Sequence, residues 1–387
     1  MSRITVVGGG IGGLTAAISC AEAGLDVHLL EASEQLGGRA RSLDGPYKAN
    51  LGPHVIYKDG PLWSWLKERD ILPAYAGLPL AGVRFRWQGE ARRLPPLGAA
   101  PSVLRLRGRQ APVDQDFRSW AASHTDEQTA EMLSSAAGVW TFHHDPGELS
   151  AAFIWGHTVR VLLSPPPTAR YLVGGWNALV SALERRAREL GVAIETGSPV
   201  DALPEPPVIV ATELSQAEAL IGQGPLTWPG GHTVCLDLGF SHRRGDPYVV
   251  ADLDECGWME RFTAPDPSLA PEGEELAQAQ IPVRPGESTE AAAARLERLL
   301  DVSLPDWRAR ETWRRRLVMD GRTGAIDLPG TTWRDRPAVD RGDGVYLVGD
   351  MVAAPGLLSE VSWASAVRAS ELASAFAGAG SRVAGAA

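Results

Sequence analysis

The chain has 387 residues and a formal net charge of −10, with 44% hydrophobic and 22% charged residues. This composition is that of a globular protein with residues for about two to three domains, and it excludes a disordered or fibrous chain. The acidic balance argues against a general nucleic-acid-binding protein, whose surface is usually basic. Only three lysines occur, Lys48, Lys58 and Lys67. The chain shows no run of about 18 apolar residues and no signal-peptide layout, which predicts a cytoplasmic protein without a membrane-spanning helix.

The N-terminal segment predicts a nucleotide-binding strand–helix–strand unit. Residues 4–7 form a β-branched run typical of a buried parallel strand. Gly8, Gly10 and Gly13 then match the pattern G-x-G-x-x-G and lead into an alanine-rich, helix-favouring segment over residues 14–23. Residues 27–30 form the second predicted strand, and Glu31 follows at its end.

Each part of this unit has a physical reason. The first glycine permits a tight turn, the second lets the backbone approach a pyrophosphate, and the third lets the helix pack closely on the strand. The N–H groups and partial positive charge at the helix N-terminus bind phosphate. Glu31 can accept hydrogen bonds from both hydroxyls of an unphosphorylated ribose. The unit therefore predicts a dinucleotide site.

A second glycine doublet follows in Leu36-Gly37-Gly38-Arg39-Ala40-Arg41. This doublet resembles that of the superfamily of FAD-dependent amine oxidases, phytoene desaturases and protoporphyrinogen oxidases. The resemblance implies that Gly38 and Arg39 follow the FAD pyrophosphate and ribose, and that residues 50–55 pass under the flavin ring. His54 lies in that segment, where a proton relay and ordinary packing are both open interpretations.

The middle and the C-terminal part of the chain extend the resemblance. A helix is predicted over residues 177–190, with strands at 192–194 and 208–212. The resemblance implies a backbone contact from Val200 to the adenine, and the strand that ends at Ala211 returns the chain to the cofactor domain. A further strand ends at Gly349 and Asp350, which the family uses near the pyrophosphate and ribityl chain.

A helix predicted over residues 359–377 follows that strand, and its N-terminus is expected to face the flavin. The desaturases carry further glycines before this helix, whereas this chain has Leu357-Leu358-Ser359-Glu360-Val361. Glu360 is therefore either a residue that favours the first helical turn or a catalytic carboxylate beside the flavin.

The predicted fold class is α/β. A discontinuous, Rossmann-type FAD-binding domain of the glutathione-reductase-like kind would comprise residues 1–60, 166–226 and 322–387. An inserted α+β substrate domain would comprise residues 61–165 and 227–321. Within it, strands are expected at 233–238 and 279–283 and a helix at 290–300. The run from Asp116 to Trp155 weakly resembles the substrate domain of the same superfamily.

Other patterns carry weaker signals. The cysteines, Cys20, Cys235 and Cys256, form no CxxC pair, so disulfide and thiolate–zinc sites are not indicated. The pair His143-His144 would point to opposite faces of a strand, which disfavours a metal site. Thirteen tryptophans either fill the core or line an apolar cavity. The basic run at 313–316 predicts a partly solvated strand, with contact to anionic lipid head groups as the alternative.

The lead hypothesis is noncovalent FAD-dependent hydride transfer from an apolar substrate of terpenoid, polyene or aromatic type to flavin N5. Oxygen or another acceptor would reoxidise the flavin, because no second G-x-G-x-x-G exists for a nicotinamide domain. The alternatives are an amine oxidase, a non-redox flavin isomerase and a flavoprotein-like binding module without turnover. Many amine oxidases of the superfamily place a lysine near N5 from the later part of the chain, and no lysine follows Lys67 here.

The candidate catalytic residues are His54 and Glu360. The residues expected to contact the cofactor are Gly8, Gly10, Ile11, Gly12, Gly13, Glu31, Ala32, Gly38, Arg39, Gly52, Pro53, His54, Val200, Ala211, Gly349, Asp350, Glu360 and Val361.

Overall fold

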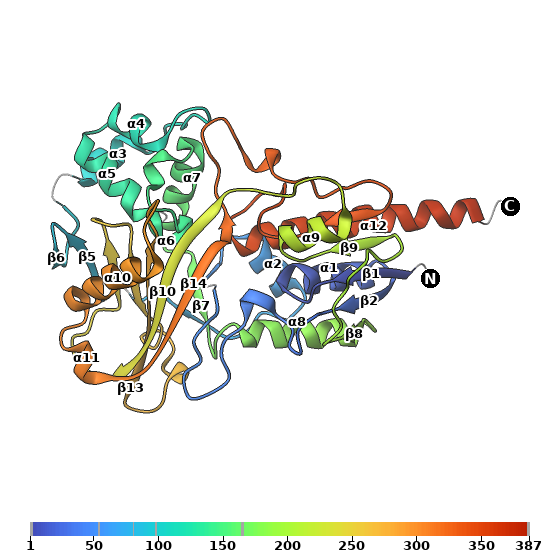
Figure 1. Cartoon of the computed structure of the whole chain (residues 1–387), viewed down its shortest axis with the longest axis horizontal. Coiled ribbons are helices and arrows are strands. Elements are labelled where there is room, and N and C mark those ends of the chain that lie inside the picture. The colour runs from blue at the N-terminus through green and yellow to red at the C-terminus, as the bar shows by residue number, and fades with distance from the viewer. Residues whose placement is uncertain (1–2, 53–54, 80, 97–98, 164–165, 385–387) are drawn as a thin grey trace.

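A parallel sheet forms one half of the molecule. The computed structural model describes residues 3–52, 55–79, 81–96, 99–163 and 166–384 (Figure 1). Five parallel strands lie in the order β15-β9-β1-β2-β8. Their bounds are β1 Arg3–Val7, β2 Asp26–Leu30, β8 Ala193–Glu195, β9 Val208–Val210 and β15 Val345–Leu347. The strands come from three separated stretches of the chain, and the predicted α/β class is confirmed.

Helices cover this sheet because its strands are apolar on both sides. Helix α1 (Ile11–Glu22) joins β1 to β2, and α8 (Asn177–Glu189) and α12 (Ser359–Ala384) both pack against α1. Figure 1 shows α12 lying along the sheet and reaching the end of the molecule where both termini lie. Val6, Ile18 and Ile209 are fully buried in the resulting core. Helix α9 (Leu214–Ile221) follows β9.

The first boundary of the predicted domains falls inside this core. Helix α2 (Pro61–Glu68) was assigned to the substrate domain, yet Leu62, Trp63 and Leu66 belong to the same buried cluster as the parallel sheet. We therefore propose that the first segment of the cofactor domain extends beyond α2. The other domain boundaries stay predictions.

A mixed sheet forms the other half. Its seven strands lie in the order β14-β10-β13-β12-β11-β5-β6, antiparallel except for the parallel pair β11–β5. Their bounds are β5 Val83–Trp87, β6 Glu90–Arg92, β10 Gly230–Ser241, β11 Val249–Asp252, β12 Trp258–Arg261, β13 Glu274–Pro282 and β14 Glu311–Ala325. Helix α10 (Thr289–Ser303) packs on one face, and α11 (Trp307–Arg310) precedes β14. The long strands β10 and β14 run between the two halves (Figure 1).

A small sheet and a helical layer complete the fold. Strands β3 (Ile56–Tyr57), β7 (Ala169–Leu172) and β4 (Tyr75–Gly77) form an antiparallel sheet in that order. The helical layer comprises α3 Ala99–Leu106, α4 Phe117–Ala122, α5 Glu127–Ala136, α6 Gly138–Thr141 and α7 Ala151–Val161. The buried tryptophans Trp120, Trp140 and Trp155 pack in its core. Within the described ranges, no helix is long and apolar enough to cross a membrane.

An ion pair in the helical layer makes a pH-dependent contribution to stability. Arg118 of α4 donates to both carboxylate oxygens of Asp145, at 3.0 and 2.6 Å. Burial alone would raise the pKa of Asp145, but the hydrogen bonds and charge of Arg118 hold that pKa below its usual value. A carboxyl group whose pKa is lowered in the folded state makes its full contribution to stability above the pKa that it has in the unfolded chain, about 3.9. That contribution is lost as the pH falls through the folded value.

We expect Asp145→Asn to lower the free energy of unfolding by about 1 kcal/mol at pH 7, because the pair is partly exposed. The difference from the unchanged protein should shrink as the pH falls below about 4, because the unfolded chain then binds a proton at Asp145 that the folded protein takes up only at lower pH. Urea denaturation at several pH values measures this difference in the free energy of unfolding. Asp201→Asn, which alters an exposed carboxylate, is the control. A difference that stays constant with pH would contradict this assignment.

Candidate functional site

The glycine turn between β1 and α1 is held by close backbone contacts. Gly8 has a φ of +104°, and a Cβ there would lie 2.5 Å from the carbonyl oxygen of Ala211 at the end of β9. A Cβ on Gly13 would lie 1.8 Å from the carbonyl oxygen of Gly8. Neither position has room for a side chain. The structure thus explains the first and third glycines by contacts within the protein.

Gly10 differs from these two glycines because it faces open space. No atom lies within 4 Å of the position that a Cβ would take, and Gly10 caps the N-terminus of α1 in an extended conformation. The first-turn N–H groups of Ile11, Gly12 and Gly13 have no acceptor within the helix. The first turn of α1 contains no acidic residue that would compete for them. The turn therefore offers a positive, unobstructed site that fits a pyrophosphate.

Glu31 lies beside the turn with its carboxylate fixed. Its Oε2 accepts from the N–H of Gly9 at 2.6 Å and its Oε1 from the N–H of Ser33 at 2.8 Å. The N–H of Ser198 donates to the carbonyl oxygen of Glu31 at 2.9 Å, which brings the loop after β8 to this edge. The predicted adenosine contacts lie on these loops, with Ala32 exposed and Val200 half-buried against the sheet core.

Arg39 and Asp350 meet across the open edge of the sheet. The two guanidinium nitrogens donate to the two carboxylate oxygens at 2.8 and 2.9 Å, and Nη1 also donates to the carbonyl oxygen of Arg322 at 2.5 Å. The charge of Asp350 raises the pKa of Arg39, against the opposing effect of burial. The sequence predicted both residues at the cofactor but not their contact, because 311 positions separate them.

Other predicted cofactor residues surround this pair. A Cβ on Gly52 would lie 3.4 Å from the carbonyl oxygen of Arg39, and one on Gly38 would lie 3.6 Å from Cα of Gly10. The N–H of Gly349 donates to Ser365 Oγ of α12 at 3.2 Å. A cavity of about 350 Å³ opens beside them at the ends of β9 and β15, lined by Arg39, Thr212, Glu213, Trp228, Gly349 and Asp350 among others. The predicted residues Pro53 and His54 lie outside the described residues.

Glu360 is placed in an ion pair at the start of α12. Its carboxylate accepts from Arg160 of α7 at 2.6 and 2.7 Å and from the N–H of Leu357 at 3.2 Å. Its side chain is 3% exposed. Arg160 also donates twice to Asp59, at 3.1 Å each. The catalytic assignment of Glu360 stays a prediction, and the observed contacts give it a structural role that joins α12 to α7. Its neighbour Val361 is buried in the turn.

A buried polar row crosses the mixed sheet and was not found from the sequence. Arg315 of β14 stands opposite Asp237 of β10, Asp237 opposite Gln278 of β13, and Gln278 opposite Glu260 of β12. Arg315 pairs with Asp237 and also donates to the carbonyl oxygen of Asn50 at 3.1 Å. The row therefore lies on the face that packs against residues 47–50. The sequence signal that could have indicated this row is the occurrence of polar residues at alternate positions of an otherwise apolar strand.

Aromatic side chains surround the end of this row. The hydroxyl of Tyr171 hydrogen-bonds to Glu260 and to the hydroxyl of Tyr248. Nε1 of Trp258 donates to the same carboxylate at 3.3 Å. Tyr171, Tyr248 and Glu260 are all buried, and burial raises the pKa of Tyr248. The cluster joins β7, which pairs with β3, to the mixed sheet.

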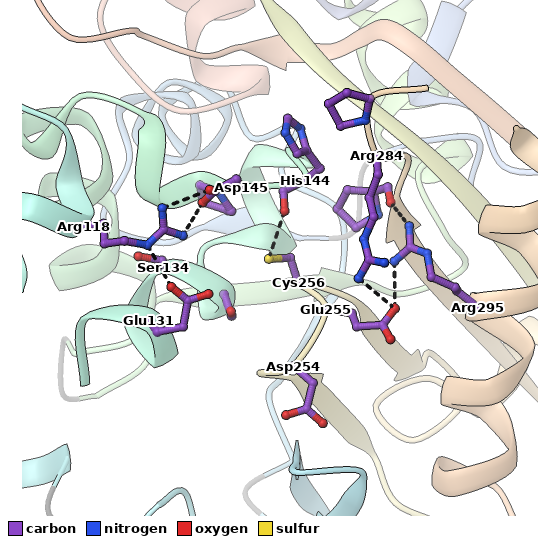
Figure 2. A pocket seen from close by; sticks show the side chains of 14 residues that line it. Arg118, Glu131, Ser134, His144, Asp145, Asp254, Glu255, Cys256, Arg284 and Arg295 are labelled. Carbon is purple, nitrogen blue, oxygen red and sulfur yellow. Dashed lines mark hydrogen bonds and ion pairs between the residues drawn. The ribbon is translucent and has the colours of Figure 1, made fainter. Parts of the chain in front are cut away.

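A second cavity of about 300 Å³ lies between the helical layer and the turn before β12. Figure 2 shows two groups of paired charged side chains in it, whereas Asp254 pairs with Arg86 outside the cavity lining. Arg118 contacts Asp145 and Glu131, and Glu255 contacts Arg284 and Arg295, the latter at 2.8 Å. Burial raises the pKa of the Cys256 thiol at its floor to about 12. The cavity therefore lies at the boundary between the helical layer and the mixed sheet.

The structure also bears on two motifs for which the sequence left alternatives open, the histidine pair at 143–144 and the basic run that contains the arginines at 314–316. His143 Nδ1 lies 2.9 Å from the backbone oxygen of Asp145. No group of three or more metal-ligating side chains that could hold an ion occurs in the described part of the chain. Each arginine at 314–316 has a carboxylate partner. Arg314 pairs with Glu297 and Glu311, Arg315 pairs with Asp237, and Arg316 pairs with Glu290.

The fold and this site define a class of protein, in which a Rossmann-like parallel sheet with a glycine-rich turn is joined to a second half built on a mixed sheet. Residues 6–69 match a family model described as an NAD(P)-binding Rossmann-like domain. A carotenoid 3,4-desaturase of Haloarcula japonica is 62% identical over 52 residues, which are 13% of this chain and 10% of that protein. The match thus spans about a tenth of the relative's length.

Solved structures extend the likeness to the whole fold. An oxidoreductase from Methanosarcina mazei superposes with a TM-score of 0.77 at 17% identity, covering 95% of this chain and 100% of that chain. Cyclohexylamine oxidase from Brevibacterium oxydans IH-35A superposes with a TM-score of 0.73 at 14% identity, covering 97% and 99%. Together these findings confirm the resemblance to the FAD-dependent amine oxidase and desaturase superfamily.

Two alanine substitutions separate folding from cofactor binding. We expect Gly13→Ala to lower the free energy of unfolding by about 1–3 kcal/mol, because its Cβ overlaps the Gly8 carbonyl. Gly10→Ala should leave stability unchanged and weaken flavin binding, because its Cβ enters only the open space. Thermal unfolding and flavin titration of apoprotein measure the two effects. Equal effects of both variants on stability would contradict the assignment.

The role of Glu360 can be tested through its partner. Arg160→Met leaves a buried carboxylate, and we expect it to lower the free energy of unfolding by about 3–5 kcal/mol. Glu360→Gln should lower the free energy of unfolding by less, because Arg160 keeps its ion pair with Asp59. The double variant should recover part of the stability that Arg160→Met loses, because no buried carboxylate is then left without a partner. Urea denaturation measures all three. If Glu360→Gln instead kept full stability and abolished flavin reduction by substrate, the catalytic assignment would be favoured.

Proposed function

We propose that the protein is an FAD-dependent oxidoreductase that holds its cofactor noncovalently. The observation that carries the proposal is the unobstructed turn at Gly10, where the N-terminus of α1 is open and Glu31 stands at its side. In this proposal the first-turn N–H groups of α1 bind the pyrophosphate and Glu31 binds the adenosine ribose. Arg39 lies close enough to Gly52 and Asp350 to act at the same edge.

The chain's own residues provide binding and orientation. When bound, FAD would supply a hydride acceptor at N5 and a route for the electrons to oxygen or another acceptor. Asp350 orients Arg39 through two hydrogen bonds, and the Arg160–Glu360 pair holds the first turn of α12. The N-terminus of that helix favours negative charge nearby. Residues 47–50 bring the buried face of the mixed sheet against the cofactor domain.

The substrate that we propose is apolar, of terpenoid, polyene or aromatic type. Support comes from the carotenoid 3,4-desaturase, which shares 62% identity over 52 residues with this chain. The absence of lysine after Lys67 removes the residue on which many amine oxidases of the superfamily depend.

An amine oxidase is the second candidate, and one observation favours it. The buried carboxylate of Glu260 is surrounded by Tyr171, Tyr248 and Trp258. A buried carboxylate suits an ammonium group through charge attraction. The superposition on cyclohexylamine oxidase concerns the fold alone.

Anaerobic mixing of the flavin-loaded protein with candidate substrates separates the two functions. We expect a carotenoid precursor in detergent to bleach the visible flavin absorbance, and primary amines to leave it unchanged. The product should gain a double bond or an oxidised carbon. Bleaching by an amine, followed by release of hydrogen peroxide and ammonia once air is admitted, together with loss of that activity in Glu260→Gln, would establish the second candidate instead. A colourless protein that binds no FAD would refute both.

A further inference from the structure

A basic and apolar surface lies at one end of this acidic protein. Residues 91–110 contain five arginines and no aspartate or glutamate, although the chain carries a net charge of −10. The segment includes the end of β6 and all of α3, which lie at the end of the molecule opposite the termini (Figure 1). We call the following seven residues the basic tip: Arg92, Arg93, Leu94, Leu104, Arg105, Arg107 and Arg109.

The leucines of the basic tip are the most exposed large apolar side chains in the described ranges. Leu94 is 68% exposed and Leu104 is 62% exposed. On α3, Ser102 and Leu106 are buried toward α5, whereas Leu104 lies on the opposite side. The four exposed arginines at 93, 105, 107 and 109 flank these leucines in the sequence.

The charge of the basic tip is largely uncompensated. Arg92 lies 3.3 Å from Glu90, and Nε of Arg109 donates to the backbone oxygen of Arg105 at 3.1 Å. Among the residues that the structure describes, no carboxylate lies within ion-pair distance of Arg93, Arg105, Arg107 or Arg109. The basic run at 314–316 is different, because each of its arginines has a carboxylate partner. The free positive charge is therefore at the tip and not on β14.

We propose that the basic tip docks this protein on a bilayer that contains anionic phospholipids. Guanidinium groups pair with lipid phosphates through two parallel hydrogen bonds, and a cluster of four to eight basic residues is the usual size for such recognition. The exposed Leu94 follows Arg93 and the exposed Leu104 precedes Arg105 on α3, so both can enter the interfacial region, as the apolar face of an interfacial helix does. A nucleic acid fits less well, because single-strand binding uses aromatic side chains that stack on bases and the tip presents leucines.

This docking goes beyond the proposed reaction and does not depend on it. Vesicle binding requires neither the cofactor nor turnover, so the two proposals can fail separately. If both hold, the tip brings the protein to the phase in which an apolar substrate dissolves.

The test is sedimentation of the full chain with vesicles of phosphatidylcholine alone or mixed with phosphatidylglycerol. We expect binding to the mixed vesicles that weakens as salt is added. The variant Arg105→Gln/Arg107→Gln/Arg109→Gln should bind about 100-fold more weakly, from about fivefold per arginine. Leu94→Ser/Leu104→Ser should weaken binding roughly tenfold, because apolar burial is lost. Unchanged thermal unfolding of each variant shows that the fold is kept.

The matched control is Arg244→Gln/Arg298→Gln/Arg334→Gln, which removes three exposed arginines elsewhere and should bind as the unchanged protein does. Equal loss in the control would show a net-charge effect and overturn the proposal. Equal binding to both vesicle types would overturn it as well. Tight binding of an oligonucleotide that depends on the three arginines but not the leucines would assign the tip to nucleic acid. A self-association abolished in the arginine variant, without vesicle binding, would assign it to a second copy.

Discussion

The approach of Gly13 to the carbonyl of Gly8 fixes the point at which α1 leaves the parallel sheet. A Cβ there would lie 1.8 Å from that oxygen, so any other residue would push the helix away from β1. Helices α8 and α12 pack on α1, and their position follows from it. The same contact leaves the first-turn N–H groups of α1 exposed beside Gly10, where the backbone is open. One steric constraint thus determines both the core of this half and the place of the proposed anion site.

Charged pairs between distant segments complete the arrangement. Arg39 joins the second glycine doublet to Asp350 and to the end of β14, and Arg160 joins α7 to the start of α12. Arg315 links the mixed sheet to Asn50. Because desolvation offsets much of the Coulomb attraction, such pairs add little net stability, whereas breaking one leaves a buried charge. Their effect here is to hold loops from different segments in one geometry at the sheet edge.

Elements with a strong local signal were predictable. The glycine turn, the strands at β1 and β2, and helices α8 and α10 lie where the sequence placed them, within a few residues at their ends. Helix α12 begins as predicted but continues to Ala384, beyond its predicted end at residue 377. Helix α2 was assigned to the substrate domain, because its tryptophans and leucines show an apolar face without showing which core it meets. The row from Arg315 to Glu260 was missed because it depends on strand register, and residues 237, 260, 278 and 315 come together only across four strands.

The sequence by itself determined the class of fold and the chemistry of the proposed dinucleotide site, because both depend on short-range spacing of glycines, apolar runs and one acidic residue. The tertiary structure decided the partner of each charge. It pairs Arg39 with Asp350 and Glu360 with Arg160, and it neutralises the arginines at 314–316 while leaving those at 105–109 exposed. Both segments are rich in arginine, so the sequence does not distinguish them. Only the surrounding carboxylates and the exposure of each side chain distinguish a structural strand from a proposed docking surface.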